Sequence, residues 1–416
     1  MSIMFGLKIF ILVLSLFNLI KIAISLCASE FFDIRQTFAT PSAYLQPAPY
    51  QPLVSVVIPA FNEERCIIRT LKKVLANDYS NFEVIVVDDG STDATSSLVE
   101  AYRQDVPSVK LVRQVNQGKS VAINHAVQKV AQGELVMVLD ADSQLVANAI
   151  TNMVAHFRDN RVLALAANVK MLPLRSWLGM AQRFEFLSAY RGKCGEDWWR
   201  NLYIIGGIGS TFRRNAMLSV GLYDTDTVTE DIDFTMKLID RLGNQDYRIG
   251  YADDVVVYTE PVSRFKSLLR QRFRWKYGRF KAFLKYRHLF FSSQKRHSKM
   301  LGWYTLPNAL LQEVLMLFEP FLFVYIQAIL IYYGEWKTYG AMLLFFGLLI
   351  SSALWQDRFE SRWEKIKLLL QLPLAYFGLF LLTLVDFWGL LKSIKKTKAL
   401  VKQTDKHANW EHVERQ

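Results

Sequence analysis

Between residues 54 and 142, hydrophobic and polar positions follow a repeating order that predicts alternating strands and helices. Short apolar runs typical of buried strands lie at 54–59, 82–87, 109–113 and 135–140. Stretches with apolar residues at helical spacing lie between them, at 63–75, 92–102 and 119–130. Ser91 is a candidate N-cap for the second of these helices. Repeated strand–helix–strand units imply a mostly parallel α/β sheet with right-handed crossovers.

Two common nucleotide-binding loops are missing from this pattern. Neither GxGxxG nor GxxxxGK followed by Ser or Thr occurs where a strand meets a helix, which disfavours a dinucleotide fold and a P-loop. In open α/β sheets, ligands bind at the carboxyl ends of the strands. The residues that follow each apolar run are therefore the candidates for chemistry.

Longer apolar segments flank this domain. Residues 4–28 are interrupted by Lys8 and Lys21, which favours an uncleaved membrane anchor over a cleaved signal peptide, with an interfacial helix as the alternative. Three later runs approach the roughly 20 residues that a helical span needs. These runs lie at 314–333, 338–355 and 368–385.

These apolar runs leave open on which side of the membrane the C-terminus lies. Three spans after a cytosolic domain would put the C-terminus outside. The tail between Lys392 and Lys406, however, contains six lysines and one acidic residue, which favours the inside. One of the runs is therefore not a full span, a further span exists, or the tail departs from the rule.

Composition and charge fit a membrane-anchored enzyme. Of the 416 residues, 51% are hydrophobic and 21% are charged, and the formal net charge is +12. Residues 264–299 contain thirteen Lys or Arg, neither Asp nor Glu, and nine interleaved aromatic residues. A basic, aromatic-rich segment followed by apolar runs favours a membrane surface over nucleic acid. The spacing of Cys27, Cys66 and Cys194 matches neither a metal cluster nor a disulfide framework, so free thiols are expected.

Two carboxylates close the fourth apolar run. Asp140 and Asp142 end the sequence VMVLDAD. Paired carboxylates at the C-terminal edge of a parallel sheet are suited to a divalent metal such as Mg²⁺ or Mn²⁺, with a solvated acidic turn as the alternative. A metal there, beside a membrane, suggests chemistry on a phosphorylated donor whose product is handed to the bilayer.

The strand ends and later motifs resemble those of membrane-embedded family 2 glycosyltransferases with the GT-A fold. Their look is closest to bacterial poly-N-acetylglucosamine synthases, which are related to hyaluronan and cellulose synthases. The matching stretches are VSVVIPAFNEE (54–64), VVDDGSTD (86–93), NQGKSVAINHAV (116–127), VLDAD (138–142), GGIGSTFRRNA (206–216), TEDID (229–233) and QRFRW (271–275). Short motifs mean little alone, but this order, ending in QxxRW before apolar runs, is specific.

On the donor side, the resemblance implies that Asp140 and Asp142 hold Mg²⁺ or Mn²⁺ against the donor diphosphate, with Asp142 the firmer ligand. Of the acidic pair after the second strand, Asp88 and Asp89, one is expected to contact uridine, and Asp89 is favoured. An Asx-type turn is the alternative for that pair.

The first strand-end loop is expected to line the nucleoside pocket, with Pro59, Ala60 and Glu63 among its residues. For Glu63, a place in the first turn of a helix is an equally good interpretation. Lys119 is expected to reach the nucleotide phosphates, because a lysine at a helix N-terminus is otherwise unfavourable.

The remaining site residues belong to two later motifs. The resemblance implies that Asp231 is the general base for the acceptor hydroxyl, with Glu230 beside it. Thr229 is in addition a candidate cap for a helix at 230–241. On a helix, QxxRW puts Gln271, Arg274 and Trp275 on one face. Their expected roles, in the same order, are hydrogen bonding to donor or acceptor, pairing with the diphosphate, and stacking on an acceptor sugar ring. An interfacial Arg/Trp helix is the alternative for this motif.

The expected domain organisation combines these segments. It consists of an N-terminal membrane anchor at 1–30, a cytosolic GT-A domain at 50–262, interfacial amphipathic helices carrying QxxRW at 263–300, transmembrane helices at 301–391 and a basic tail at 392–416. The fold class is thus an α/β GT-A domain, Rossmann-like and mostly parallel, combined with interfacial and membrane helices.

The expected function is that of a UDP-sugar-dependent hexosyltransferase. By resemblance it is a processive, inverting, multi-pass enzyme of the plasma membrane that makes a β-linked exopolysaccharide. N-acetylglucosamine is the favoured sugar, and glucose is next. Its partners are the UDP-sugar, the growing polysaccharide or a lipid acceptor, and membrane lipids, but not nucleic acid; the need for a small membrane partner protein is left open. The alternatives are a glycolipid glycosyltransferase that makes a single addition and a non-catalytic membrane scaffold.

Overall fold

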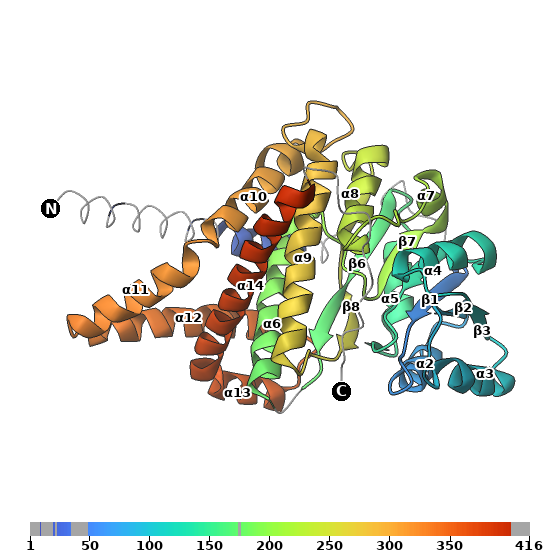
Figure 1. Cartoon of the computed structure of the whole chain (residues 1–416), viewed down its shortest axis with the longest axis horizontal. Coiled ribbons are helices and arrows are strands. Elements are labelled where there is room, and N and C mark those ends of the chain that lie inside the picture. Colours follow the sequence, from blue (N-terminus) through green and yellow to red (C-terminus); the bar gives the residue numbers. More distant parts are fainter. Residues whose placement is uncertain (1–8, 10–19, 21–22, 35–48, 174–175, 401–416) are drawn as a thin grey trace.

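The fold is built on one eight-stranded mixed sheet with helices on both faces (Figure 1). The computed structural model describes residues 9, 20, 23–34, 49–173 and 176–400. Along the sheet the strand order is β3-β2-β1-β4-β7-β6-β8-β5. The strands are β1 (Val54–Ala60), β2 (Phe82–Asp88), β3 (Val109–Arg113), β4 (Leu135–Val138), β5 (Gln144–Leu145), β6 (Val162–Met171), β7 (Ser210–Arg213) and β8 (Arg248–Thr259).

The four strands expected from the sequence are present and form the parallel half of the sheet, β3-β2-β1-β4. Every residue of β1 is buried, because helices cover both faces of the sheet, and this explains its continuous apolar run. Beyond β4 the sheet is mixed, since β7 runs antiparallel to both β4 and β6. The predicted fold class, a mostly parallel α/β sheet followed by apolar helices, is confirmed.

Helices cover both faces of the sheet, and the helices of the C-terminal part of the chain form a further group. Apolar residues of α2, α3 and α5 form the core on one face of the sheet, and those of α4 and α8 contribute to the core on the other. The helices of the sheet domain and its border are α2 (Ile67–Leu75), α3 (Thr95–Asp105), α4 (Lys119–His125), α5 (Ala149–His156), α6 (Trp177–Trp198), α7 (Arg214–Ser219), α8 (Glu230–Leu242) and α9 (Phe265–Lys285). The later helices are α10 (Leu306–Leu315), α11 (Glu319–Tyr332), α12 (Trp336–Gln356), α13 (Arg362–Leu370) and α14 (Leu372–Leu400).

The predicted cap of α3 is wrong. The helix begins at Thr95, and the carboxylate of Asp93 accepts hydrogen bonds from the Thr95 backbone N–H at 3.0 Å and from its hydroxyl at 2.6 Å. Ser91 is used elsewhere, because its hydroxyl oxygen accepts from the backbone N–H of Asn62 at 3.0 Å. The Ser91 side chain thus links two strand-end loops instead of capping α3.

Helices α6, α9 and α14 lie side by side along the border of the sheet domain (Figure 1). Two glycines of α14 let its backbone approach its neighbours. A β-carbon at Gly378 would lie 3.0 Å from the β-carbon of Ala181 in α6, and one at Gly389 would lie 3.2 Å from the backbone nitrogen of Phe273 in α9. The last long apolar helix is therefore packed against the domain that carries the strand-end motifs.

Several cations of the basic segment form ion pairs within the protein. Arg272 of α9 pairs with Glu185 of α6 at 2.6 Å. Lys276 and Arg279 both pair with Glu313 of α10, at 3.0 and 2.6 Å, and the Glu313 side chain is 4% exposed. The sequence of this segment favours a membrane surface as the partner of its positive charge. Part of that charge instead holds α6, α9 and α10 together.

By length and composition, two described helices are able to cross a membrane, Trp336–Gln356 and Leu372–Lys396. The run expected at 314–333 is broken: α11 follows the preceding helical segment at a bend of 57°. Its 14 residues extend about 21 Å, less than the roughly 30 Å hydrocarbon core. Pro320 at the start of α11 is the physical reason, since proline opens a helix but does not continue one. One of the three apolar runs is therefore not a single straight helix, and the bent pair counts as a third crossing only if both halves act together.

Most of the expected N-terminal anchor and most of the basic tail lie outside the described residues. Within the described part, residues 23–34 are helical and contact α6, where Arg191 pairs with Asp33 at 3.0 Å and with Glu30 at 3.4 Å. The end of the N-terminal segment is therefore attached to the same helix that packs against α9 and α14.

Candidate active site

The expected donor-side residues lie at the carboxyl edge of the parallel strands. Ala60, at the end of β1, is in register with Asp88, at the end of β2, and Pro59 is in register with Val87. The backbone N–H of Leu139, just after β4, donates to the carbonyl of Val57 at 3.0 Å. Adjacent strands thus bring three separate stretches of sequence to one edge.

Asp88 and Asp89 are both buried and both shape loops. The carboxylate of Asp88 accepts from the backbone N–H of Ser91 at 2.9 Å, as in an Asx-type turn. The carboxylate of Asp89 accepts from the Gln114 side-chain amide at 2.8 Å and from the backbone N–H groups of Gln117 and Gly118 at 2.9 and 2.8 Å. Asp89 therefore holds the loop that leads into Lys119. This task differs from the uridine contact predicted for it, which stays a prediction.

Glu63 follows the first strand-end loop but does not open a helix. No acidic residue lies in the first turn of α2, so that interpretation of Glu63 is wrong. Its carboxylate instead accepts from the Cys66 thiol at 2.9 Å, and its backbone N–H donates to the Thr95 hydroxyl at 2.8 Å. Burial is the main reason why the pKa of the Cys66 thiol is raised, with Glu63 adding to the effect. The loop is thereby tied to the start of α3.

Lys119 connects two motifs that lie far apart in the sequence. Its ammonium lies 2.7 Å from the carboxylate of Asp140 and 2.8 Å from that of Glu230. Burial alone would lower the pKa of Lys119, but the two carboxylates raise it well above its usual value. A β-carbon at Gly207 would lie 2.9 Å from this ammonium, so a larger residue there would require the end of the Lys119 side chain to shift. Sequence reasoning predicted a nucleotide contact for Lys119 and missed this bridge.

Glu230 and Asp231 open α8 and differ in their electrostatics. Burial raises the pKa of both carboxyl groups, but Lys119 and Arg274 hold that of Glu230 below its ordinary value. The pKa of Asp231 is raised to about 6, first by burial and then by the charge of Glu230. Thr229 is the N-cap residue, but no side-chain cap bond is present and its buried hydroxyl oxygen has no hydrogen-bond partner among the described residues. The predicted N-cap position of Thr229 is therefore confirmed, but its side chain makes no capping hydrogen bond.

The DAD turn fits a divalent metal in its chemistry. Asp142 is 2% exposed, and its carboxylate accepts from the Ser143 hydroxyl at 3.3 Å. The Thr70 hydroxyl fixes the turn by donating to the carbonyl of Ala141 at 2.7 Å. Within the described residues, no group of three or more His, Cys, Asp or Glu is arranged for a metal. Two carboxylates suit an ion such as Mg²⁺ that takes its other ligands from phosphate and water.

The QxxRW residues lie in the middle of α9. Gln271 is 7% exposed, and Arg274 is within electrostatic reach of Glu230 and Asp231, since it lowers the pKa of both. The guanidinium of Arg272 lies over the Trp275 ring, 4.7 Å from its centroid. One face of Trp275 thus contacts a cation, and its stacking on a sugar ring stays a prediction.

Sequence reasoning also missed α6, which carries none of the family motifs. Lys193 of this helix lies over the ring of Tyr251, with its ammonium 5.7 Å from the centroid. Burial lowers the pKa of Lys193, against the opposing charges of Glu196 and Asp231. Helix α6 therefore puts a cation within electrostatic reach of Asp231. The local sequence offered no signal for it.

Comparisons with known proteins concern the sheet domain. The profile "Glycosyl transferase family 2" matches residues 55–219. A poly-beta-1,6-N-acetyl-D-glucosamine synthase from Staphylococcus epidermidis is 30% identical over 227 residues, which is 54% of each chain. The enzyme of the same name from Staphylococcus aureus (strain COL) is 30% identical over 244 residues, 58% of this chain and 57% of the relative. The chain thus spans little more than half the length of these curated relatives.

A solved structure supports the fold. A mannosyltransferase from Pyrobaculum calidifontis, determined with GDP-Man and Mn²⁺, superposes with a TM-score of 0.56 and 21% identity. The match covers 92% of this chain and 99% of the mannosyltransferase. At this identity the likeness concerns the fold alone. Residues 55–219 thus match the glycosyl transferase family 2 model, and the solved structure supports a GT-A-like fold for the sheet that carries them.

Proposed function

We propose that this protein is a processive, inverting glycosyltransferase that transfers N-acetylglucosamine from UDP-N-acetylglucosamine to a growing β-linked polysaccharide at the membrane. The observation that carries the proposal is the cluster of Lys119, Asp140, Glu230 and Asp231 at the carboxyl edge of the sheet. The 30% identity to poly-beta-1,6-N-acetyl-D-glucosamine synthases supports the choice of sugar and of a polymeric product.

In this proposal, the acceptor hydroxyl attacks C1 of the donor sugar as the bond from C1 to the diphosphate oxygen breaks. The hydroxyl proton passes to Asp231, and UDP leaves with the bond's electron pair. Asp231 suits this task because its pKa of about 6 lies near the working pH of a general base. Asp140 and Asp142 would hold a divalent metal, which would neutralise charge on the diphosphate. Glu230 remains ionised and keeps Lys119 beside Asp140.

We assign Trp275 as the surface on which the acceptor sugar ring stacks. We assign Arg274 as a contact for the diphosphate of the donor. The guanidinium of Arg274 presents a planar fork that a lysine cannot reproduce. Replacing Trp275 with alanine should shorten the polymer more than it weakens UDP binding. An equal loss of both would point to a structural role for Trp275.

We further propose that the catalytic domain faces the cytosol and that α12 crosses the membrane. Trp336 and Trp355 stand near the two ends of α12, and their side chains are 64% and 84% exposed. They are 19 positions apart, which corresponds to about 28 Å along a helix, close to the thickness of the hydrocarbon core. Tryptophans at both ends of a span are typical of the two membrane interfaces.

The experiment that tests the function uses membranes containing the full chain and a panel of UDP-sugars. Released UDP and product length are measured in the same reaction. We expect UDP release and a polymer with UDP-N-acetylglucosamine. A single added sugar on a lipid would favour the glycolipid glycosyltransferase, whereas no UDP release with any sugar would favour the scaffold. Repeating the assay with and without candidate membrane proteins tests the need for a partner subunit.

A further inference from the structure

We propose that one face of α9, C-terminal to Arg274, sets the position of the Asp231 carboxylate, and that Lys285 on this face is a positioning residue for the reaction. The inference rests on the proposed function, because it concerns the group assigned there as the general base. It assigns a task to a stretch of the basic segment that none of the sequence motifs includes.

The face is defined by spacing along α9. Arg274, Gly278, Lys281 and Lys285 are separated by four, three and four residues, which puts them in one row on a helix. Arg274 stands at the start of this row and acts electrostatically on Glu230 and Asp231. The three residues that follow all contact the segment from 224 to 233, which leads into and through the start of α8.

At Gly278 the backbone of α9 lies against the side chain of Thr229. A β-carbon at this position would overlap the hydroxyl oxygen of Thr229 and lie 2.5 and 2.8 Å from its Cγ2 and Cβ atoms. Real β-carbons do not approach other atoms this closely, so the two helices are in contact at Gly278. Thr229 is the residue immediately before Glu230 and Asp231. A shift of α9 would therefore move the backbone that carries the two carboxylates.

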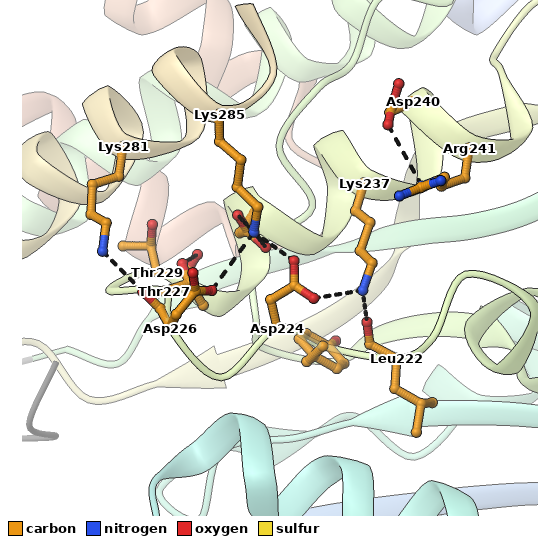
Figure 2. A network of polar contacts seen from close by, with 12 residues as sticks. Leu222, Asp224, Asp226, Thr227, Thr229, Lys237, Asp240, Arg241, Lys281 and Lys285 are labelled. Atoms are coloured by element: carbon orange, nitrogen blue, oxygen red, sulfur yellow. Dashed lines mark hydrogen bonds and ion pairs between the residues drawn. The ribbon is translucent and has the colours of Figure 1, made fainter. Parts of the chain in front are cut away.

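Figure 2 shows a network of charged groups that holds the same segment further along. Lys285 lies 2.5 Å from the carboxylate of Asp224 and 2.9 Å from that of Asp233. Lys281 donates to the backbone carbonyl of Asp226 at 2.9 Å. From α8, Lys237 donates to the other carboxylate oxygen of Asp224 at 2.7 Å and to the carbonyl of Leu222 at 2.8 Å.

The electrostatics of this network make Lys285 costly to replace. The Asp233 side chain is 3% exposed, and burial raises the pKa of its carboxyl group while Lys285 lowers it. Burial alone would lower the pKa of Lys285, but Asp224 and Asp233 raise it well above its usual range. A neutral residue at 285 would leave a buried carboxylate without this cation, which is unfavourable. The start of α8 would then be free to move away from α9.

Such movement has a specific consequence for the site. Asp231 lies between Thr229 and Asp233, the two points at which α9 holds this segment. Lys119 also contacts Glu230 of this segment, but its ion pair with Asp140 and the contacts of the strand-end loops belong to other elements and are kept. Loss of the α9 contacts should therefore displace the base relative to the donor while donor binding persists. A purely structural role would weaken both together.

The first test is steric. Gly278→Ala, Thr229→Gly and the double variant are compared in the full chain, with Thr229→Gly as the reference for the double variant. Gly278→Ala should lower turnover by up to about 10²-fold, the cost of misplacing a reacting group by roughly 1 Å. The affinity for UDP, measured by calorimetry, should stay within about threefold. Removing the Thr229 side chain recreates the space, so the double variant should regain most of the turnover of its reference; no recovery would overturn the inference.

The second test is electrostatic. Lys285→Gln should lower turnover at saturating donor by about tenfold with little change in UDP affinity, because the base is displaced and the donor site is not. Lys285→Arg should restore most of the turnover, since it keeps a cation within reach of Asp224 and Asp233. Lys266→Gln, at an exposed lysine in the first turn of the same helix, is the matched control. Unchanged turnover in Lys285→Gln, or an equal fall in turnover and UDP affinity, would overturn the proposal.

The two proposals fail in different ways. If the unmodified protein releases no UDP from any sugar nucleotide, the proposed function is wrong. If it turns over normally and neither the Gly278 nor the Lys285 variants separate turnover from UDP affinity, only the positioning role is wrong. Thermal unfolding of each variant is recorded with the activities, so that a loss of folded protein is not counted as a loss of turnover.

Discussion

Glu230 and Asp231 are adjacent at the start of α8, and their carboxyl groups have pKa values shifted in opposite directions. Burial disfavours the charged form of both, but Lys119 lies 2.8 Å from Glu230 and stabilises its carboxylate. Asp231 experiences burial together with the charge of Glu230, which raises its pKa to about 6. Active sites separate the tasks of two neighbouring acids in this way. Here, Glu230 holds a cation and Asp231 is suited to accept a proton.

Turnover should depend on pH through Asp231. Because its pKa is raised to about 6, the carboxylate that accepts a proton is present above this pH and is lost as the pH falls through it. The measurement is turnover against pH at saturating donor. An acid limb at the ordinary value of an aspartate would contradict the assignment.

Replacing the base should separate chemistry from binding. Asp231→Asn should lower turnover by about 10²–10⁴-fold, the usual contribution of a general base, while UDP affinity persists. Asp246→Asn, at an exposed aspartate, is the matched control. Near-normal turnover in Asp231→Asn would direct attention to Glu230 as the base.

Lys119→Met should destabilise the fold, because it leaves Asp140 and Glu230 without the cation between them. Removing one partner of a largely buried ion pair typically costs about 3 kcal/mol or more. Glu230 has a lowered pKa in the folded protein, so its pairing stabilises the fold above its unfolded pKa and this contribution is lost as the pH falls. The thermal midpoint of Lys119→Met relative to the unmodified protein should therefore differ most near neutral pH and least in acid. A difference that is independent of pH would argue against an electrostatic origin.

Metal dependence should be visible in binding as well as in activity. Chelation should abolish turnover, and added Mg²⁺ or Mn²⁺ should restore it. UDP should bind more tightly with Mn²⁺ than without it, and Asp142→Asn should remove this difference while the protein still folds. Full turnover in excess chelator would exclude the metal site at Asp140 and Asp142.

The position of α12 in the membrane can be tested with single cysteines in a protein whose native cysteines have been replaced. Leu344→Cys lies within α12 at a side chain that is 64% exposed, and Glu335→Cys lies in the exposed turn before it. We expect the thiol introduced by Leu344→Cys to be protected from a membrane-impermeant reagent in intact cells. The thiol introduced by Glu335→Cys, beyond the apolar stretch of α12, should react with the same reagent once the membrane is permeabilised. Equal reactivity of the two variants would show that α12 does not cross.

The local pattern determined the parallel half of the sheet and the ends of its strands. A continuous apolar run reports burial on both faces, and the carboxyl ends of parallel strands necessarily share one edge. The presence of Pro59, Asp88 and Asp140 at that edge therefore followed from the sequence. The start of α8 at Glu230 followed as well, because acidic residues open helices.

The tertiary structure alone decided which of these groups are partners. Lys119 and Glu230 are 111 positions apart, and no local rule relates a helix-start lysine to an acidic residue so distant. The hydroxyl of Ser91 links two loops because Asn62 comes within 3.0 Å of it, which overrides its local preference to cap α3.

The same reason applies to α6 and to the basic segment. The charge of α9 indicates that anions lie nearby, but not whether they are lipid or protein. Folding brings Glu185, Glu313 and Asp233 to this helix, and a buried carboxylate is stable only beside a cation. Composition thus determined that the helix is basic, whereas the packing of α6, α8 and α10 around it decided what that charge does.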